Sequence, residues 1–175
     1  TGAALVVKSD CYHEIKGLDG DFFAHMEEID LCWRLKIKGY KIITFPHSKV
    51  YHLGGGTLPT ESPRKLFYNH RNNLYMLFKN LSPSTFLPVI IIRLILDFIS
   101  ALAYLLQGKP SFFLMVLKSH IHFYGSLTSL LSKRRGVNLV RTNTKISGIY
   151  KRSIVWDFFI SNRKNYNSLN PRSFI

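Results

Sequence analysis

The sequence has few cysteines and no pattern that holds a structural metal. Its two cysteines, Cys11 and Cys32, form no Cys-x-x-Cys pair and no disulfide framework, which is typical of a reducing compartment. Helix-turn-helix, zinc-finger and RNA-recognition signatures are also missing, so we expect no nucleic-acid partner. These absences direct attention to how the charged and apolar residues are distributed.

Acidic residues are scarce after His52. Residues 1–52 carry seven basic and seven acidic residues, whereas the rest carries 17 basic residues and only Glu61, Asp97 and Asp157 as acids. The formal net charge of +14 therefore lies entirely in the second part of the chain. Because its basic residues alternate with long Leu, Ile and Phe runs, we expect an anionic membrane surface as its partner.

Short apolar runs before His52 predict strands. Residues 3–7 form an apolar run without alternation, which is typical of a strand buried on both faces. Residues 42–45 predict a second strand, which Pro46 ends, and residues 49–51 a further short extended piece. Ser9 is expected to cap a short helix that continues to Ile15.

An acidic segment, residues 25–34, contains three carboxylates within four positions. A helix that begins near Glu27 and ends at Gly39 would place Glu27, Asp30 and Arg34 on one face, with Glu28 directed beyond the helix N-terminus. The unpaired amides of the first turn stabilise charged carboxylates there. The segment is either the seat of a general base or a capped helix braced by an Asp30–Arg34 pair.

Several stretches agree in order and spacing with one known pattern. They are Thr1–Ala3, Gly17–Phe23, Glu27–Arg34, Gly39-Tyr40, Pro46 and Val50–His52. Together they cover about a third of the chain and resemble the C-terminal half of the catalytic domain of family 2 glycosyltransferases. The nearest resemblance is to rhamnosyltransferase-like enzymes of bacterial surface polysaccharide synthesis. It implies an α/β fold, namely the C-terminal half of a GT-A (nucleotide-diphospho-sugar transferase) domain followed by an amphipathic helical hairpin.

The resemblance implies an inverting transfer of a sugar from a nucleotide-sugar donor to a saccharide or lipid-linked acceptor. Glu28 stands where the family has a catalytic Asp, and it would take the proton from the acceptor hydroxyl, with Glu27 as the reserve base. The resemblance also implies a set of substrate-binding residues, which are Gly2, Ala3, Asp19, Asp30 and Arg71. For Arg71 a solvated basic face is the alternative.

The resemblance places His52 at a site for Mg²⁺ or Mn²⁺, and a structural hydrogen bond is the alternative for this residue. The family holds the divalent cation mainly through an Asp-x-Asp motif in a nucleotide-binding half that this sequence lacks. We therefore expect the chain to be a fragment that is inactive alone. Gly54, Gly55 and Gly56 would form either a loop that closes over the donor or a flexible connection.

Long apolar helices are expected after His52. Ser62 and Pro63 begin a helix that runs to about Asn80. Residues 86–106 are long enough to cross a bilayer, yet they carry a polar stripe. Residues 111–131 repeat this plan after a Gly-Lys-Pro turn, which indicates a hairpin. The hairpin could cross the bilayer or pack on other protein, but intramembrane charges favour a position in the membrane interface.

These expectations divide the chain into three parts. Residues 1–82 would complete a catalytic domain, residues 83–135 would form the membrane-associated hairpin, and residues 136–175 would form a basic tail with a short apolar helix. The expected location is the cytoplasmic face of the inner membrane, as a peripheral or monotopic protein. The alternative function is a non-catalytic membrane-attachment or interaction module.

Overall fold

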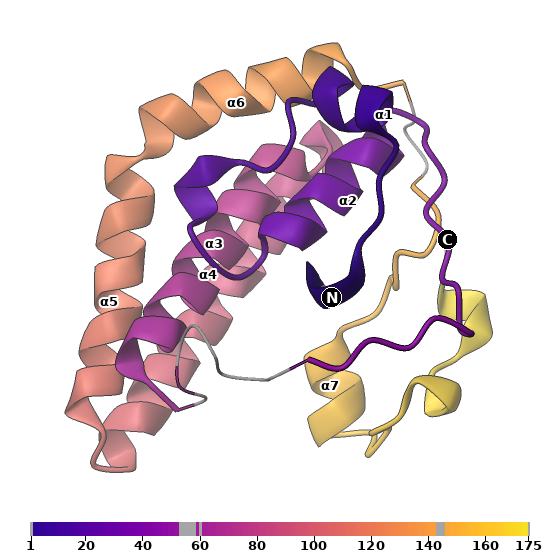
Figure 1. Ribbon diagram of the computed structural model, residues 1–175. Coiled ribbons are helices and arrows are strands. Elements are labelled where there is room, and N and C mark those ends of the chain that lie inside the picture. Colours follow the sequence, from indigo (N-terminus) through magenta and orange to yellow (C-terminus); the bar gives the residue numbers. More distant parts are fainter. Residues whose placement is uncertain (1, 53–58, 60, 143–145, 175) are drawn as a thin grey trace.

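The computed structural model describes residues 2–52, 59, 61–142 and 146–174, and these residues form a mostly helical chain (Figure 1). The α-helices are α1 (Ser9–Glu14), α2 (Glu27–Ile37), α3 (Pro63–Asn80), α4 (Pro83–Leu106), α5 (Pro110–Gly125), α6 (Leu127–Leu139) and α7 (Ile154–Phe159). Short 3-10 turns lie at Gly2–Ala4, Gly20–Phe22, Tyr166–Ser168 and Pro171–Ser173. Within these described ranges no β-strand forms, and one isolated bridge joins Tyr150 to Phe174.

Local signals set the ends of α2 and α3 as expected. Helix α2 begins at Glu27, and Gly39 follows its C-terminal cap with a φ of +99° that favours glycine. Helix α3 begins with Pro63 at its first position, and the Ser62 side chain accepts a hydrogen bond from the Lys65 amide at 3.2 Å. The expected cap of α1 is wrong, because Ser9 is its first helical residue and no side chain caps it.

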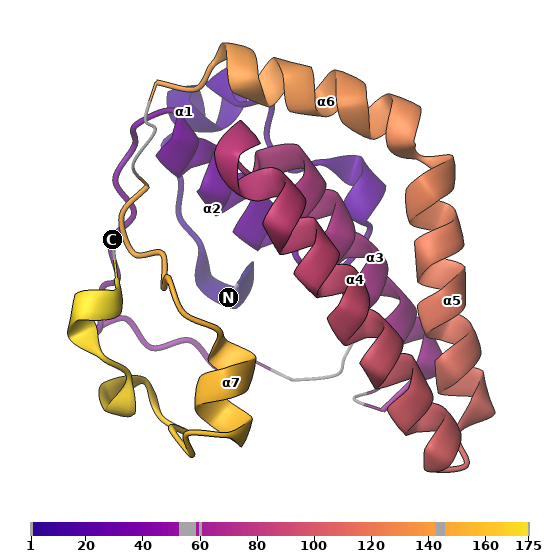
Figure 2. The ribbon, with the colours of Figure 1, turned by 180° about the vertical axis from the view of Figure 1, so that it is seen from behind.

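Helix α3 is the centre of the packing. It contacts α2, α4, α5 and α6, and Figure 2 shows α4 beside it when the molecule is seen from behind. The main core combines the Gly20–Phe22 turn with side chains from α3, α5 and α6. Its fully or nearly buried members are Phe22, Leu74, Tyr75, Met76, Phe78, Phe123 and Leu130. The predicted boundary after residue 82 thus falls between helices that share one core, and the three-part division stays a prediction.

The second half of the expected hairpin is bent. We expected one helix over residues 111–131, but α5 ends at Gly125 and α6 starts at Leu127. The hydroxyl groups of Tyr75 and Ser126 lie 2.5 Å apart at this bend. Helix α6 then runs across one end of the molecule, near α1 and α2 (Figure 1). The bend carries Lys133 and Arg134 back to the protein rather than along the hairpin.

The predicted α/β fold is wrong. Residues 5–7 and 40–45 lie outside helices and strands, and Val6 and Ile43 are 99% and 84% exposed. A strand needs a neighbour that satisfies its backbone N–H and C=O groups. The described part of the chain offers no such neighbour, so the apolar character of these runs did not make them strands.

Candidate functional site

The loop before α2 has a strained backbone that one amide side chain holds. Positive φ angles of 61°, 68° and 72° occur at Phe23, His25 and Met26. The Asn72 side chain is fully buried on α3, and its Nδ2 atom lies within 2.9 Å of three carbonyl oxygens, those of Phe22, Ala24 and His25. Strained segments that their surroundings enforce are frequent at functional sites. This clamp determines where the acidic start of α2 lies.

Glu28 lies at the N-terminus of α2 beside the start of the chain. Its Oε1 atom accepts a hydrogen bond from the Gly2 amide at 3.3 Å. A Cβ atom added at Gly2 would lie 3.3 Å from the Glu28 Cβ, so a side chain there would crowd the glutamate. The structure thus brings together the predicted base and Gly2 of the predicted substrate-binding set, with the partly buried Ala3 next in the chain.

Two buried polar atoms of residues that precede Glu28 have no hydrogen-bond partner among the residues that the structure describes. They are Oε2 of Glu27 and Nε2 of His25. Leaving a buried polar atom unsatisfied costs about 1–3 kcal/mol, and such atoms in native proteins are explained by strain, by an ordered water or ion, or by a redox or catalytic role. The acidic start of α2 therefore combines a strained loop, a half-buried glutamate and two unused polar atoms.

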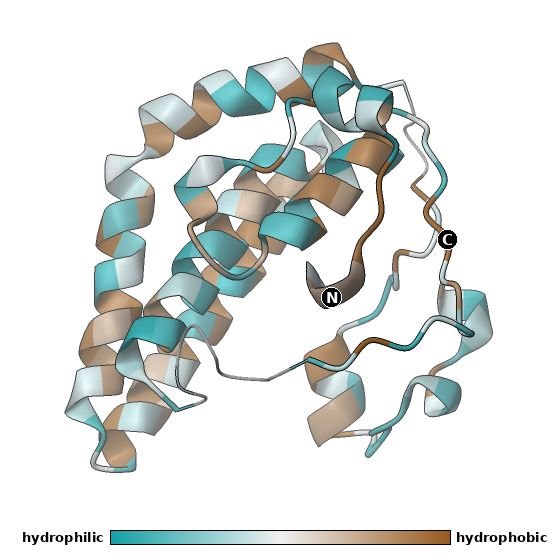
Figure 3. Cartoon of the chain, in the orientation of Figure 1, coloured by the Kyte–Doolittle hydropathy of each residue, from teal (hydrophilic) through white to brown (hydrophobic). Residues whose placement is uncertain are grey.

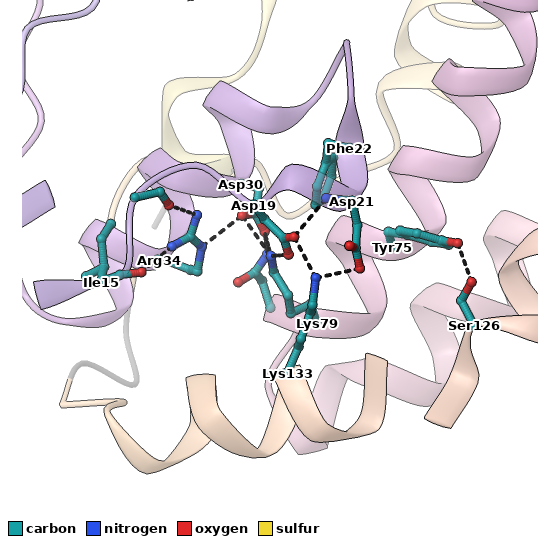
Figure 4. A network of polar contacts seen from close by, with 12 residues as sticks. Ile15, Asp19, Asp21, Phe22, Asp30, Arg34, Tyr75, Lys79, Ser126 and Lys133 are labelled. Carbon is teal, nitrogen blue, oxygen red and sulfur yellow. Dashed lines mark hydrogen bonds and ion pairs between the residues drawn. The ribbon is translucent and has the colours of Figure 1, made fainter. Parts of the chain in front are cut away.

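Asp30, in contrast, is fully buried and fully paired. Its carboxylate accepts hydrogen bonds from Arg34 Nε at 2.8 Å, from Lys79 Nζ at 2.9 Å and from Asn80 Nδ2 at 2.7 Å (Figure 4). Arg34 uses its remaining nitrogens to donate to the carbonyl oxygens of Ile15 and Gly17, at 2.6 and 2.7 Å. The alternative interpretation, a helix braced by Asp30 and Arg34, describes these contacts.

Asp19 joins the same network from the loop before α2. Its carboxylate accepts hydrogen bonds from Lys79 at 2.7 Å and from Lys133 at 2.6 Å (Figure 4). Burial raises the pKa of Asp19, but the hydrogen bonds from Lys133 and Lys79 outweigh this effect and lower the pKa to about 2. Asp19 also lines a cavity of about 600 Å³ between the segment around Ile15 and α6.

Arg71 is engaged within the protein. Its Nη2 atom donates to the carbonyl oxygen of Asp21 at 2.7 Å, and its Nε atom donates to Asn72 Oδ1 at 2.9 Å. The guanidinium also lies 5.0 Å from the ring centre of Tyr68. These contacts tie α3 to the loop before α2, so Arg71 supports the same strained segment as Asn72.

His52 is exposed and lies outside any helix, and its predicted role at a metal site stays a prediction. The described residues also contain no group of three His, Cys, Asp or Glu side chains that could hold a metal ion. The cation was expected to be held mainly by an Asp-x-Asp motif outside this sequence, so the Mg²⁺ or Mn²⁺ site at His52 stays a prediction. The predicted loop of Gly54, Gly55 and Gly56 lies outside the described residues.

A buried ionic cluster between α3, α4 and α5 was not predicted. Asp97 is 1% exposed, and its carboxylate lies 2.6 Å from Arg93, 2.8 Å from His70 and 3.1 Å from His120. Arg93 and Asp97 belong to the polar stripe that was expected on residues 86–106, but the sequence analysis did not single out the two histidines. Asp97 was the sequence signal for this cluster, because a carboxylate buried within an apolar helix needs several polar partners.

Helix α4 is long and apolar enough to cross a membrane. Core helices of soluble proteins can have the same composition, but they are mostly buried. Only 17% of the most apolar window of α4 is buried, so most of its apolar residues face outward. Figure 3 shows the apolar colour on the adjoining part of α5, near the α4–α5 turn. These features define the class of the chain, a helical bundle with a membrane-compatible helix.

Comparison with known proteins gives no match: no protein-family model, no curated protein and no solved structure is similar to this chain. The resemblance to family 2 glycosyltransferases is therefore wrong as an assignment of family. The helical architecture contradicts it as well, since a GT-A domain is built on a sheet and the described residues contain none.

Proposed function

We propose that the chain attaches to an anionic membrane surface through the outer faces of α4 and α5. One observation carries this proposal: α4 buries its only acidic residue and exposes most of its large apolar side chains, and α5 exposes Leu114, Leu117 and Ile121 beside it. Asp97 is buried against α3 and α5, whereas nine large apolar side chains of α4 are exposed. They are Leu87, Ile91, Ile92, Ile95, Phe98, Ile99, Leu102, Leu105 and Leu106.

The energy of this arrangement favours a lipid environment. Burying the exposed half of a Leu or Ile side chain gains about 1 kcal/mol, so nine such side chains would gain on the order of 10 kcal/mol. The net charge of +14 adds attraction to anionic headgroups. Lys133 and Arg134 contribute little to this attraction, because they donate to Asp19 and to the Phe78 carbonyl inside the protein.

Binding to liposomes tests the attachment. The full chain should sediment with vesicles of phosphatidylglycerol and phosphatidylcholine, and raising the salt from about 50 to 500 mM should weaken binding without abolishing it. The double variant Ile95→Glu/Phe98→Glu should bind at least tenfold more weakly while its helical circular dichroism is retained. Val6→Glu is the matched control at an exposed apolar site outside these helices. Equal binding of all three proteins would refute the proposal.

The second candidate function is sugar transfer with Glu28 as the general base. The Glu27 Oε2 and His25 Nε2 atoms favour it, because they are polar atoms near the start of α2 that no group of the described chain uses. Glu28 would take the proton of an acceptor hydroxyl while that oxygen bonds to the anomeric carbon and the bond to the nucleoside diphosphate breaks. This proposal concerns the chemistry of one carboxylate and needs no GT-A fold.

Release of nucleoside diphosphate from a panel of nucleotide-sugars tests this second function in the complete gene product. Glu28→Gln should reduce turnover by at least about 100-fold, because a general base is lost. Glu14→Gln is the control, since Glu14 pairs with Lys38 and Tyr40 away from α2's first turn. Unchanged turnover in Glu28→Gln would transfer the role to another group, and no release with any donor would leave membrane attachment as the function.

A further inference from the structure

The cavity beside α6 has apolar walls that nothing in the described chain covers. Its volume of about 600 Å³ lies within the usual range for small-molecule sites, about 300–1,000 Å³. Leu18 lines one wall, and Leu139 and Val140 line the other. These side chains are 47%, 86% and 42% exposed, although most apolar residues of this size around them are buried. The walls therefore suit an apolar ligand.

The charged residues around the cavity indicate which head group the ligand would carry. Arg34, Lys79 and Lys133 line the cavity, but each of them already pairs with a carboxylate of the network in Figure 4. Glu14, which also lines the cavity, pairs with Lys38. Lys16 is the lining cation that has no carboxylate partner within the described ranges. One positive charge is thus left unmatched at the rim.

We propose that this groove binds a single-chain amphiphile with a monoanionic head group, the chemistry shared by fatty acids and lysolipid-type phosphates. The head group lies at Lys16, and the chain lies between Leu18 and α6. Gly136 on α6 leaves room for it, because a Cβ atom added there would meet no atom within 4 Å. The proposal rests on the membrane attachment, which supplies amphiphiles from the bilayer surface.

Fluorescence titration with the fatty-acid probe 11-(dansylamino)undecanoate tests the groove. The full chain is kept soluble with amphipol, and the signal of the probe with amphipol alone is subtracted. The wild type should show saturable binding. Gly136→Trp should weaken it at least tenfold by filling the groove, whereas Gly136→Ala, the matched control, should bind as the wild type does. Lys16→Gln should weaken binding of the anionic probe several-fold and leave competition by uncharged dodecanol unchanged.

Competition identifies the source of the ligand, since dodecanoate and lysophosphatidylglycerol should displace the probe and inorganic phosphate should not. Equal affinities of wild type and Gly136→Trp would overturn the proposal, and so would a wild type that binds no probe. The liposome assay with the same proteins keeps the two proposals apart. A wild type that binds the probe but not vesicles would refute the attachment, whereas a wild type that binds vesicles but not the probe would refute the groove.

Discussion

Replacing Asp30 with asparagine removes the central charge of the network below α2 and keeps the shape of the side chain. Asp30 is 0% exposed and accepts hydrogen bonds from Arg34, Lys79 and Asn80. Removing one partner of a buried ion pair costs about 3–5 kcal/mol, because the remaining charge stays buried. Lys79 keeps its contact with Asp19 at 2.7 Å, so we expect the lower end, about 3 kcal/mol.

Urea unfolding followed by circular dichroism measures this loss. With an m-value of about 2 kcal/mol per molar urea, a loss of 3 kcal/mol lowers the midpoint by roughly 1.5 M. Asp10→Asn is the control, because Asp10 is exposed in the first turn of α1 and should change stability by less than about 0.5 kcal/mol. If the Asp30→Asn midpoint stays within about 0.3 M of the wild type, the network does not hold α2 to α3.

Three further changes test other parts of the structure. Asn72→Ala should lower the free energy of unfolding by about 2–3 kcal/mol in thermal melts, because three loop carbonyls lose their donor. The pKa of Asp19 is about 2 in the folded protein, below its unfolded value, so its carboxylate should add about 2 kcal/mol to the free energy of unfolding above pH 4. This contribution should disappear as the pH falls towards 2, and Asp19→Asn should flatten the acid-induced loss of stability. Asp97→Asn should cost about 3 kcal/mol by leaving Arg93 beside two unpaired imidazoles, and an unchanged melting temperature would contradict the buried cluster.

Side-chain partners far apart in the sequence account for most of what sequence reasoning missed at the candidate site. Asp19 and Asp30 were assigned to substrate binding, yet Lys79 and Lys133 occupy their oxygens from 49 to 114 residues away. The clamp by Asn72 was hidden for the same reason, because its three acceptors lie in another segment. Glu28 accepts a hydrogen bond from Gly2, and the roles that the sequence analysis assigned to these two residues stay predictions.

The sequence by itself determined where several of the helices begin and end. A serine cap followed by proline starts α3, a glycine follows α2, and Gly-Lys-Pro separates α4 from α5, as expected. The apolar island after Ser153 likewise forms α7. These features are readable because the hydrogen bonds of a helix join residues four apart, so its energy depends on neighbours in the sequence.

Only the tertiary structure decided which apolar runs became regular elements and which polar groups met. Residues 3–7 and 42–45 have the composition of strands, but a strand needs a distant partner strand, and neither segment forms a strand in the described chain. The bend between α5 and α6 and the burial of Asp97 depend in the same way on α3 packing against several helices. Local sequence cannot specify such contacts, because their energy arises only after separate segments have come together.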